Sequence, residues 1–333
     1  MEVTRIQGKA VLVTGAAGFI GSHLAEQLVG LGARVRAFIR YNSRNDRGLL
    51  EYLPPDRLRE VDVFPGDLRD PDAVRAACRG VEIVFHLGAL IAIPYSYRNP
   101  TDVIATNVLG TLNVLQAGRD TGVRRIIHTS TSEVYGTAQR VPIDETHPVQ
   151  GQSPYSASKI GADKVAESFY RAFGVPVCTL RPFNTYGPRQ SARAVIPTII
   201  TQALVGNEVH LGDLAPRRDL TFVSDTVGGF LRMAEAGDDV LGQEVNLGAN
   251  SEVSVGDLAA KICALIGTSP RIVTESDRVR PKKSEVFRLL ADNRKAERMI
   301  GWKPQVSLDA GLRQTIDWIR QNLDRYRPSE YQV

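Results

Sequence analysis

The sequence predicts an α/β fold in which a doubly wound parallel sheet carries a smaller mixed α/β lobe. Short apolar, β-branched runs alternate with helical segments through the first half of the 333 residues. After about Arg181 this alternation loosens, and Pro, Gly and short strand-like pieces mix with helices. We therefore expect one domain over 1–182, with 222–250 returning to it, and a second lobe formed mainly by 183–221 and 251–333.

Each element is predicted from its own pattern. Parallel strands are buried on both faces and therefore form continuous apolar runs. The first run is Ala10–Thr14, and the turn after it leads into a helix over Ser22–Leu31. Further strands are predicted at Arg34–Ile39, Val61–Phe64, Ile83–His86, Arg125–Ser130 and Val175–Leu180. Further helices are predicted at Pro71–Arg79, Val103–Gly118, Tyr155–Phe173, Ile196–Val205, Asp225–Ala236, Val255–Ile266 and Asp309–Leu323.

Charge and cysteine content argue against several classes of protein. The net charge is only +4 and the basic residues are scattered, so nucleic acid is not an expected partner. Cys78, Cys178 and Cys263 lie far apart without metal-ligand spacing, which argues against a metal site or a disulfide framework. No apolar run is long enough for a signal core or a membrane span, so we expect a cytoplasmic protein with no membrane partner.

The turn after the first strand has the composition of a phosphate-binding loop. Gly15, Gly18 and Gly21 form a GxxGxxG pattern, in which Phe19 and Ile20 complete the word GAAGFIG. Glycine permits the tight turn, and a missing side chain lets the backbone approach a pyrophosphate. The N–H groups at the start of the following helix then face the phosphates. This loop predicts a Rossmann domain that binds a dinucleotide.

The end of the second strand indicates which dinucleotide is bound. An acid there would accept the 2′-hydroxyl of NAD, but the stretch after Ile39 has no acid at the expected place. Arg40 and Arg44, with Ser43, suit a 2′-phosphate instead. We therefore expect NADP in preference to NAD, bound tightly. Asp67, at the end of the third strand, is expected either to accept a hydrogen bond from the adenine amino group or to cap the next helix.

Tyr155 and Lys159 form a YxxxK motif. Residues four apart share a helix face, so the phenol and the ammonium group can converge. A lysine cation, together with an oxidised nicotinamide, is expected to lower the pKa of Tyr155 and make it a general base. The histidines show no ligand spacing, and we expect structural roles for them.

Seven sequence words, spread over nearly the whole chain, resemble those of extended short-chain dehydrogenases/reductases of the NAD-dependent epimerase/dehydratase family. They are GAAGFIG, GDL at 66–68, HLGA at 86–89, TNVLGTLNVL at 106–115, YSASK at 155–159, RPFNTYGPRQ at 181–190 and RRDLTFVSD at 217–225. The resemblance implies a triad of Thr131, Tyr155 and Lys159, in which Thr131 hydrogen-bonds the sugar 4-hydroxyl.

Glu133 indicates which enzymes of this family the chain resembles most. Simple 4-epimerases resemble SSAAVYG at this point, whereas this chain reads TSTSEVYG, similar to GDP-mannose 4,6-dehydratase. The words GQSPYSASK and FNTYGPRQSARAVIPTII are most similar to the dehydratases of the legionaminic acid pathway. The resemblance implies a nucleotide-sugar 4,6-dehydratase for a UDP- or GDP-linked hexose, with N-acetylglucosamine as the expected sugar. Glu133 would remove the C5 proton.

Other activities stay open at this point. UDP-glucuronate decarboxylases carry a similar run around Glu133, and 4-epimerases share the triad. A non-catalytic dinucleotide sensor belongs to a different class, and such sensors typically lose the tyrosine or the lysine that this chain retains.

The same resemblance implies the remaining contacts and the assembly. The partner is a nucleotide-diphosphate sugar, with Asn184 at its diphosphate, Arg218 and Arg280 at the diphosphate or ribose, and Leu211 against the base. The helices at 103–118 and 155–173 resemble those that form a homodimer interface. Further cofactor contacts are implied for Leu68, Leu87, Ala89 and Asn107.

Overall fold

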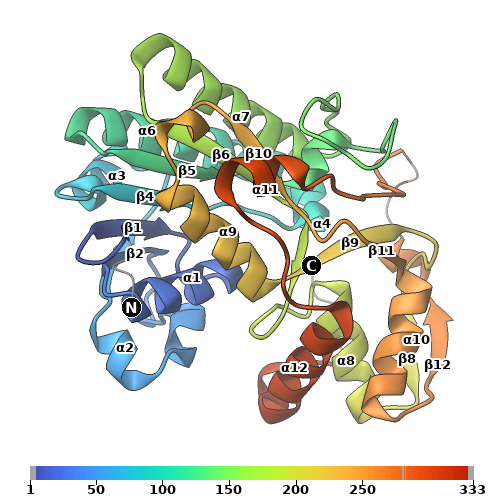
Figure 1. Ribbon diagram of the computed structural model, residues 1–333. Helices are drawn as coiled ribbons and strands as arrows, with labels where there is room; N and C mark the ends of the chain where they lie inside the picture. The colour runs from blue at the N-terminus through green and yellow to red at the C-terminus, as the bar shows by residue number, and fades with distance from the viewer. Residues whose placement is uncertain (1–4, 280, 282, 329–333) are drawn as a thin grey trace.

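A seven-stranded parallel sheet forms the centre of the computed structural model, which describes residues 5–279, 281 and 283–328 (Figure 1). The strand order is β10-β6-β5-β4-β1-β2-β3, so the sheet grows in opposite directions from β1 and β4, as a doubly wound sheet does. The predicted fold class is confirmed. The strands are β1 (Ala10–Thr14), β2 (Arg34–Arg40), β3 (Asp62–Gly66), β4 (Ile83–His86), β5 (Arg125–Thr129), β6 (Val177–Pro182) and β10 (Glu244–Leu247).

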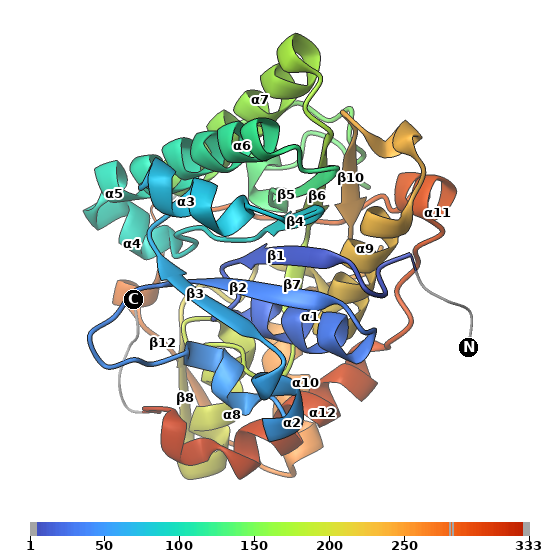
Figure 2. The ribbon, with the colours of Figure 1, turned by 90° about the vertical axis from the view of Figure 1, so that its left-hand side faces the viewer.

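Helices cover both faces of this sheet (Figures 1 and 2). One face carries α3 (Pro71–Cys78), α6 (Gly110–Thr121) and α7 (Pro154–Phe173), and the other carries α1 (Phe19–Gly30) and α9 (Val223–Glu235). Strand β1 contributes to both cores, because successive side chains of a strand point to opposite faces. Val11 and Val13 pack on the α1 side and Leu12 on the α6 side. Burial on both faces explains the continuous apolar run in the sequence.

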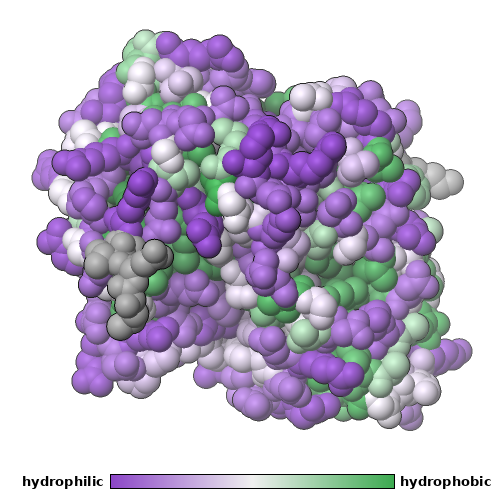
Figure 3. Space-filling view, viewed as in Figure 1, coloured by the Kyte–Doolittle hydropathy of each residue, from purple (hydrophilic) through white to green (hydrophobic). Residues whose placement is uncertain are grey.

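The rest of the chain forms a smaller lobe with two small sheets. One sheet has the order β11 (Glu252–Ser254), β9 (Arg217–Phe222), β7 (Asn184–Tyr186), and the other pairs β12 (Arg271–Thr274) with β8 (Glu208–Leu211). On the face seen in Figure 3, hydrophobic residues gather mainly over the lobe around α8, α10 and β9. Within the described residues, no helix is both long and apolar enough to cross a bilayer. The helices of the lobe are α8 (Val195–Val205), α10 (Val255–Ile266) and α12 (Leu308–Gln321).

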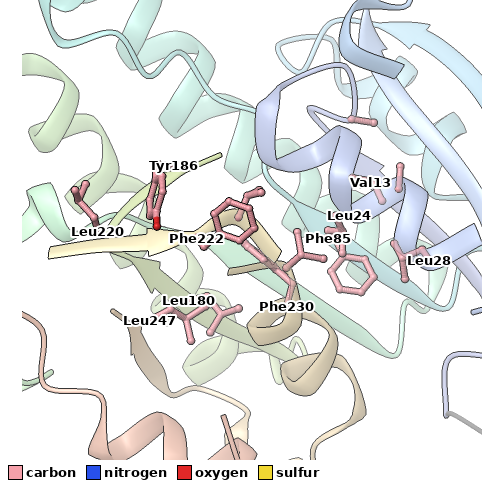
Figure 4. Packing of buried hydrophobic residues seen from close by; sticks show 14 of the residues in the cluster. Val13, Leu24, Leu28, Phe85, Leu180, Tyr186, Leu220, Phe222, Phe230 and Leu247 are labelled. Carbon is pink, nitrogen blue, oxygen red and sulfur yellow. The ribbon is translucent and has the colours of Figure 1, made fainter. Parts of the chain in front are cut away.

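A single hydrophobic cluster joins the two parts of the molecule (Figure 4). It contains Leu24 of α1, Phe85 of β4 and Phe230 of α9 beneath the large sheet. The same cluster includes Tyr186 of β7 and Phe222 of β9, whose rings meet edge to face at 5.5 Å. Shared burial therefore fixes how the lobe sits against the sheet.

Helix boundaries differ from the expected ones where glycine, proline or a π-helical turn decides them. Helix α1 begins at Phe19 rather than at Ser22, because Gly18 is its N-cap. The helix expected over Val103–Gly118 is longer and interrupted. It consists of α5 (Pro100–Ile104), a π-helical turn (Ala105–Leu109) and α6.

Three short helices fall in segments where the sequence pattern predicts no element. They contain five to seven residues each, too few to show a helical period. They are α2 (Pro55–Arg59), α4 (Ile93–Arg98) and α11 (Arg294–Ile300).

The side chain of Arg125, in β5, caps the carboxyl end of α9. A helix leaves its last carbonyl groups without intrahelical partners. The buried Arg125 guanidinium donates Nη1 hydrogen bonds to the carbonyls of Met233 (3.1 Å), Ala234 (3.2 Å) and Ala236 (2.6 Å). The strand that leads to Thr131 is thereby tied to the helix on its other face.

We expect Arg125→Met to lower the free energy of unfolding by about 2–3 kcal/mol, because several buried carbonyls lose their donor at once. The matched control is Arg124→Met, since the Arg124 side chain is 77% exposed and lies 3.9 Å from Glu82. This control should change stability by less than about 0.5 kcal/mol. Urea unfolding of both variants measures the difference, and equal effects would contradict the capping role.

Candidate active site

The predicted functional residues gather at the edge of the sheet where its parallel strands end. The glycine loop follows β1, Leu87 follows β4, Thr131 follows β5 and Asn184 follows β6. In doubly wound sheets the ligand crevice lies outside these carboxyl ends. The strand order therefore brings the residues expected at the cofactor and those expected at the substrate to one edge.

The glycine loop has no room for side chains at Gly15 and Gly21. Gly15 has a φ of +71°, and a Cβ there would lie 2.8 Å from the backbone of Gly88. A Cβ on Gly21 would overlap the carbonyl oxygen of Gly15. Gly18 caps α1 without any side-chain hydrogen bond, so the first N–H groups of the helix remain available. These donors and the open backbone fit a dinucleotide pyrophosphate.

Asp67, expected at the adenine, directly follows β3 and is held by Arg69. Arg69 Nη2 donates to Asp67 Oδ2 at 2.6 Å, and Nη1 donates to Asp102 at 2.9 Å. The hydrogen bond from Arg69 lowers the pKa of Asp67 to about 2, which keeps the carboxylate charged. The helix cap is Asp70 instead, whose side chain accepts two backbone N–H bonds at the start of α3. The adenine contact of Asp67 stays a prediction.

The residues predicted to read the 2′ position lie in an exposed loop after β2. Arg40, Ser43 and Arg44 are all exposed, and the loop returns to the glycine loop through a backbone hydrogen bond from Leu49. Arg44 lies 3.6 Å from Asp46, an exposed pair of the kind that contributes little to stability. Both guanidinium groups are therefore accessible to an anion.

Asn107 is buried in the π-helical turn and holds the loop after β4. Its Oδ1 accepts the Leu90 N–H at 2.8 Å, and its Nδ2 donates to the Leu90 carbonyl and to Ser158 Oγ at 2.9 Å. A π-helical turn alters the direction of its side chains and is frequent at functional sites. Asn107 thereby ties the segment that carries Leu87 and Ala89 to α7.

His86 completes a chain of hydrogen bonds between β1 and this turn. The Gly88 N–H donates to Thr14 Oγ1 (3.0 Å), and with a neutral His86 the Thr14 hydroxyl donates to His86 Nδ1 (2.8 Å). His86 Nε2 then donates to Thr111 Oγ1 (3.0 Å), and Thr111 donates to the Asn107 carbonyl (2.7 Å). This order requires a neutral imidazole, and burial lowers the pKa of His86 accordingly.

The start of α7 is fixed by a reciprocal cap. Ser153 Oγ accepts the N–H of Ser156 at 3.1 Å, and Ser156 Oγ accepts the N–H of Ser153 at 2.9 Å. Pro154 occupies the first helical position, where its missing N–H costs nothing. The cap places Tyr155 in the first turn of the helix and Lys159 one turn later.

The structure brings Tyr155, Lys159 and the end of β5 together. Lys159 Nζ donates to the Thr129 carbonyl at 2.6 Å, and Thr131 hydrogen-bonds the Tyr155 phenol. Thr131 also accepts the N–H of Glu133 at 3.2 Å, as the N-cap of a 3₁₀ turn over Ser132–Tyr135. The predicted catalytic residues therefore form one compact group.

Burial has the largest effect on the pKa values of Tyr155 and Lys159. Burial raises the pKa of Tyr155, while the hydrogen bond with Thr131 opposes the rise and the charge of Glu133 adds to it. Burial also lowers the pKa of Lys159 to about 8. The expected lowering of the Tyr155 pKa is therefore not produced by the side chains of the chain itself.

Glu133 lies within electrostatic reach of the Tyr155 phenol and is half-buried. Within the described residues, no donor hydrogen-bonds its carboxylate, so both oxygens are available to a ligand. The neighbouring Ser132 is buried in the protein interior. Of the two, Glu133 is the side chain with the freedom to reach a bound molecule.

The residues expected at the substrate differ in their contacts. Asn184 Nδ2 is buried without a hydrogen-bond partner among the described residues, as a group awaiting a ligand would be. Leu211, at the end of β8, is buried. Arg218 is paired with Glu285 at 2.8 Å rather than directed freely into a cleft. Arg280 lies outside the described residues.

Four charged or polar residues behind the catalytic group were not recognised from the sequence as one hydrogen-bonded cluster. Asp163 accepts hydrogen bonds from His128 Nε2 (3.1 Å), Ser130 Oγ (2.7 Å) and Arg181 Nη2 (3.1 Å), and all four residues are buried. The only available signal was the helical spacing, because Asp163 lies eight residues after Tyr155 on α7. His128 and Ser130 lie at the end of β5 and Arg181 lies on β6, and no common motif links them to Asp163.

Comparisons with known proteins find relatives that match nearly the whole chain. The sequence profile of the GDP-mannose 4,6-dehydratase family matches residues 12–315. The UDP-glucose 4-epimerase of Mycolicibacterium smegmatis is 32% identical over 315 residues, covering 93% of this chain and 98% of that protein. The dTDP-glucose 4,6-dehydratase of Streptomyces antibioticus is 32% identical, covering 96% and 94%.

A solved structure has the same architecture. The dTDP-glucose 4,6-dehydratase from Streptomyces venezuelae, with NAD bound, superposes with a TM-score of 0.84 at 32% identity, covering 96% of this chain and 100% of that chain. The similarity extends over both the sheet and the lobe. The chain therefore belongs to the GDP-mannose 4,6-dehydratase-like family of NAD(P)-dependent nucleotide-sugar dehydratases and epimerases.

Proposed function

We propose that this protein is a nucleotide-sugar 4,6-dehydratase. The observation that carries the proposal is the unpartnered carboxylate of Glu133, which lies beside the group formed by Thr131, Tyr155 and Lys159. An enzyme that only oxidises and reduces C4 needs no second base, whereas elimination of water requires one. The half-buried position of Glu133 supports that additional role.

The chemistry follows from these residue types. The bound dinucleotide supplies hydride acceptance from C4 and hydride return to C6. Tyr155 takes the proton of the sugar 4-hydroxyl, which Thr131 orients, and the positive charge of Lys159 stabilises the phenolate. The C4 ketone acidifies C5–H, and Glu133 removes that proton. The 6-hydroxyl then leaves as water.

Glu133 would act as both base and acid in this elimination. The leaving 6-hydroxyl needs a proton, and the buried Ser132 beside Glu133 cannot supply one. Glu133 holds the proton just taken from C5 and can deliver it to the leaving oxygen. Tyr155 returns its proton through solvent when C5 is reprotonated, so the residues end in their starting states.

The substrate proposed is a UDP- or GDP-linked hexose, with N-acetylglucosamine as the sugar. A nucleotide diphosphate suits the unpaired, buried amide of Asn184. The contacts proposed for Leu211, Arg218 and Arg280 rest on family resemblance alone. Arg218 would have to exchange Glu285 for phosphate or ribose, which a guanidinium can do when the ligand is the stronger acceptor.

We also propose NADP in preference to NAD, although the solved relative binds NAD. Arg40 and Arg44 are exposed beside the glycine loop, and the pair of Arg44 with Asp46 is weak enough to open. A homodimer is proposed as well. Ile104 and Leu109, 41% and 50% exposed, are apolar side chains on the helical stretch that packs beside α7.

A 4-epimerase is the second candidate, because the relative from Mycolicibacterium smegmatis has that activity. Epimerisation would use Thr131, Tyr155 and Lys159 and leave Glu133 without a chemical role. UDP-glucuronate decarboxylation would likewise need no proton removal from C5. A non-catalytic sensor is disfavoured by the complete triad.

The purified protein should convert a nucleotide hexose into a 4-keto-6-deoxy sugar without consuming added NAD or NADP. The reason is that the hydride taken from C4 is returned to C6 of the same molecule. Mass spectrometry of a panel of UDP- and GDP-sugars, UDP-glucuronate included, measures loss of one water. Release of CO₂, or an epimer of unchanged mass, would support the alternatives instead.

Glu133→Gln should lower dehydration by roughly 10²–10⁴-fold, because the amide keeps the shape but cannot take the C5 proton. The first oxidation should survive, so reduced nicotinamide should accumulate and be visible by its absorbance. Tyr155→Phe is the matched comparison, since it should abolish even that absorbance. Normal turnover by the glutamine variant would remove the main support for a dehydratase.

Replacing both Arg40 and Arg44 by alanine should weaken NADP binding by about 1.5–3 kcal/mol for each charged hydrogen bond lost, and leave NAD binding unchanged. Arg47→Ala is the control, because Arg47 lies on the same loop but is paired with Glu51. Fluorescence titration of each dinucleotide measures the change. Tighter binding of NAD than of NADP by the wild type would contradict the preference.

A further inference from the structure

Three ionisable residues lie in line on one face of α7. Tyr155, Lys159 and Asp163 are spaced by four residues, so they project from the same side over two helical turns. All three are buried. The proposed mechanism uses the first two, and it leaves a buried carboxylate without a role immediately behind them. A buried charge is costly unless other groups compensate for it.

Asp163 holds the end of β5 in place through hydrogen bonds. Its carboxylate accepts hydrogen bonds from His128 and from Ser130, the residues on either side of Thr129. The Thr129 carbonyl receives Lys159 Nζ. Because both neighbours are held, the Thr129 carbonyl faces Lys159. Thr131, which follows Ser130, faces Tyr155.

Asp163 also supplies the negative charge nearest to Lys159. Lys159 Nζ has one hydrogen-bond acceptor among the described residues, the uncharged Thr129 carbonyl. The charge of Asp163 favours the lysine cation, against the burial that lowers its pKa to about 8. Arg181 pairs with Asp163 at 3.1 Å, so its positive charge partly offsets the carboxylate charge that acts on Lys159.

The other ionisable groups near Lys159 and Asp163 come from β4, β5, the 3₁₀ turn, β6 and β10. Burial lowers the pKa of both histidines and raises that of Tyr135, so these three groups are neutral near neutral pH. The full set is His86 of β4, His128 of β5, Glu133 and Tyr135 of the 3₁₀ turn, Arg181 of β6 and Glu244 of β10, which lies 3.7 Å from Arg181.

We propose that Asp163 is a positioning residue for hydride transfer, which holds the end of β5 against Lys159 and Tyr155 and supplies the charge that keeps Lys159 cationic. The proposal rests on the proposed function only in the roles of Tyr155 and Lys159. These roles are common to dehydratase, epimerase and decarboxylase chemistry. It therefore does not depend on Glu133.

The test is the pH dependence of nicotinamide reduction in Asp163→Asn. Without the negative charge, Lys159 loses its proton at lower pH, so the alkaline limb should move down by about one pH unit. The same charge raises the pKa of Tyr155, so its removal should also move the acid limb down. Both limbs of the profile of reduction rate against pH should therefore move to lower pH. Stopped-flow absorbance of the holoenzyme with the panel of nucleotide sugars measures it.

Two further variants separate charge from structure. Ser130→Ala removes a hydrogen bond to Asp163 and keeps the charge, so its rate can fall but its profile should stay in place. Asp163→Asn/Arg181→Gln removes the whole buried pair and leaves no unpaired guanidinium, which protects folding. It should also show a downward displacement, smaller than that of Asp163→Asn, because the guanidinium charge removed with the carboxylate opposes the lysine cation.

The outcomes are distinct. Profiles of Asp163→Asn and the double variant that coincide with the wild type would overturn the inference and leave the proposed function standing. A displacement in Ser130→Ala equal to that in Asp163→Asn would reduce Asp163 to a structural role. A wild-type protein that reduces nicotinamide with none of the nucleotide sugars would overturn the proposed function, and the inference with it.

Discussion

The parallel pairing of β1, β4, β5 and β6 is the constraint on which the rest of the molecule depends. Every strand runs in one direction, so every strand ends at one edge, and the chain must cross back behind the sheet before it can contribute again. The glycine loop, Leu87, Thr131 and Asn184 follow the ends of four such strands. The strand order therefore brings together residues that lie far apart in the sequence, and no direct contact between them is needed.

Behind this edge the protein buries a group of polar side chains, most of which are paired, although His128 Nδ1 and Thr129 Oγ1 have no hydrogen-bond partner among the described residues. The chain from Thr14 through His86 to Asn107 is fully hydrogen-bonded when the histidine is neutral, the state that burial favours. The pair of Asp163 and Arg181 is different, because two full charges are withdrawn from water. Such a pair adds little net stability, and its retention is more readily explained by chemistry at Lys159.

The sequence was sufficient wherever a local pattern decides the structure. The bounds of β1, β4 and α10 coincide with those predicted, and the fold class follows from the same patterns. It was insufficient where distant residues meet. The contacts of the Asn107 amide and of the Asp163 carboxylate with residues far away in the chain have no local signature. For Tyr155, the spacing indicates the nearby lysine but not the burial of the phenol, which raises its pKa.

The hydrophobic cluster shared by Phe85, Phe230, Tyr186 and Phe222 bears on how the molecule can move. Opening the lobe from the sheet as a rigid body would expose these rings to water, so the two parts behave as one thermodynamic unit and have no low-energy hinge. Nucleotide sugar and product must then pass by local displacement of loops. During turnover, only the loops at the edge of the sheet then move, and the hydrophobic cluster stays packed.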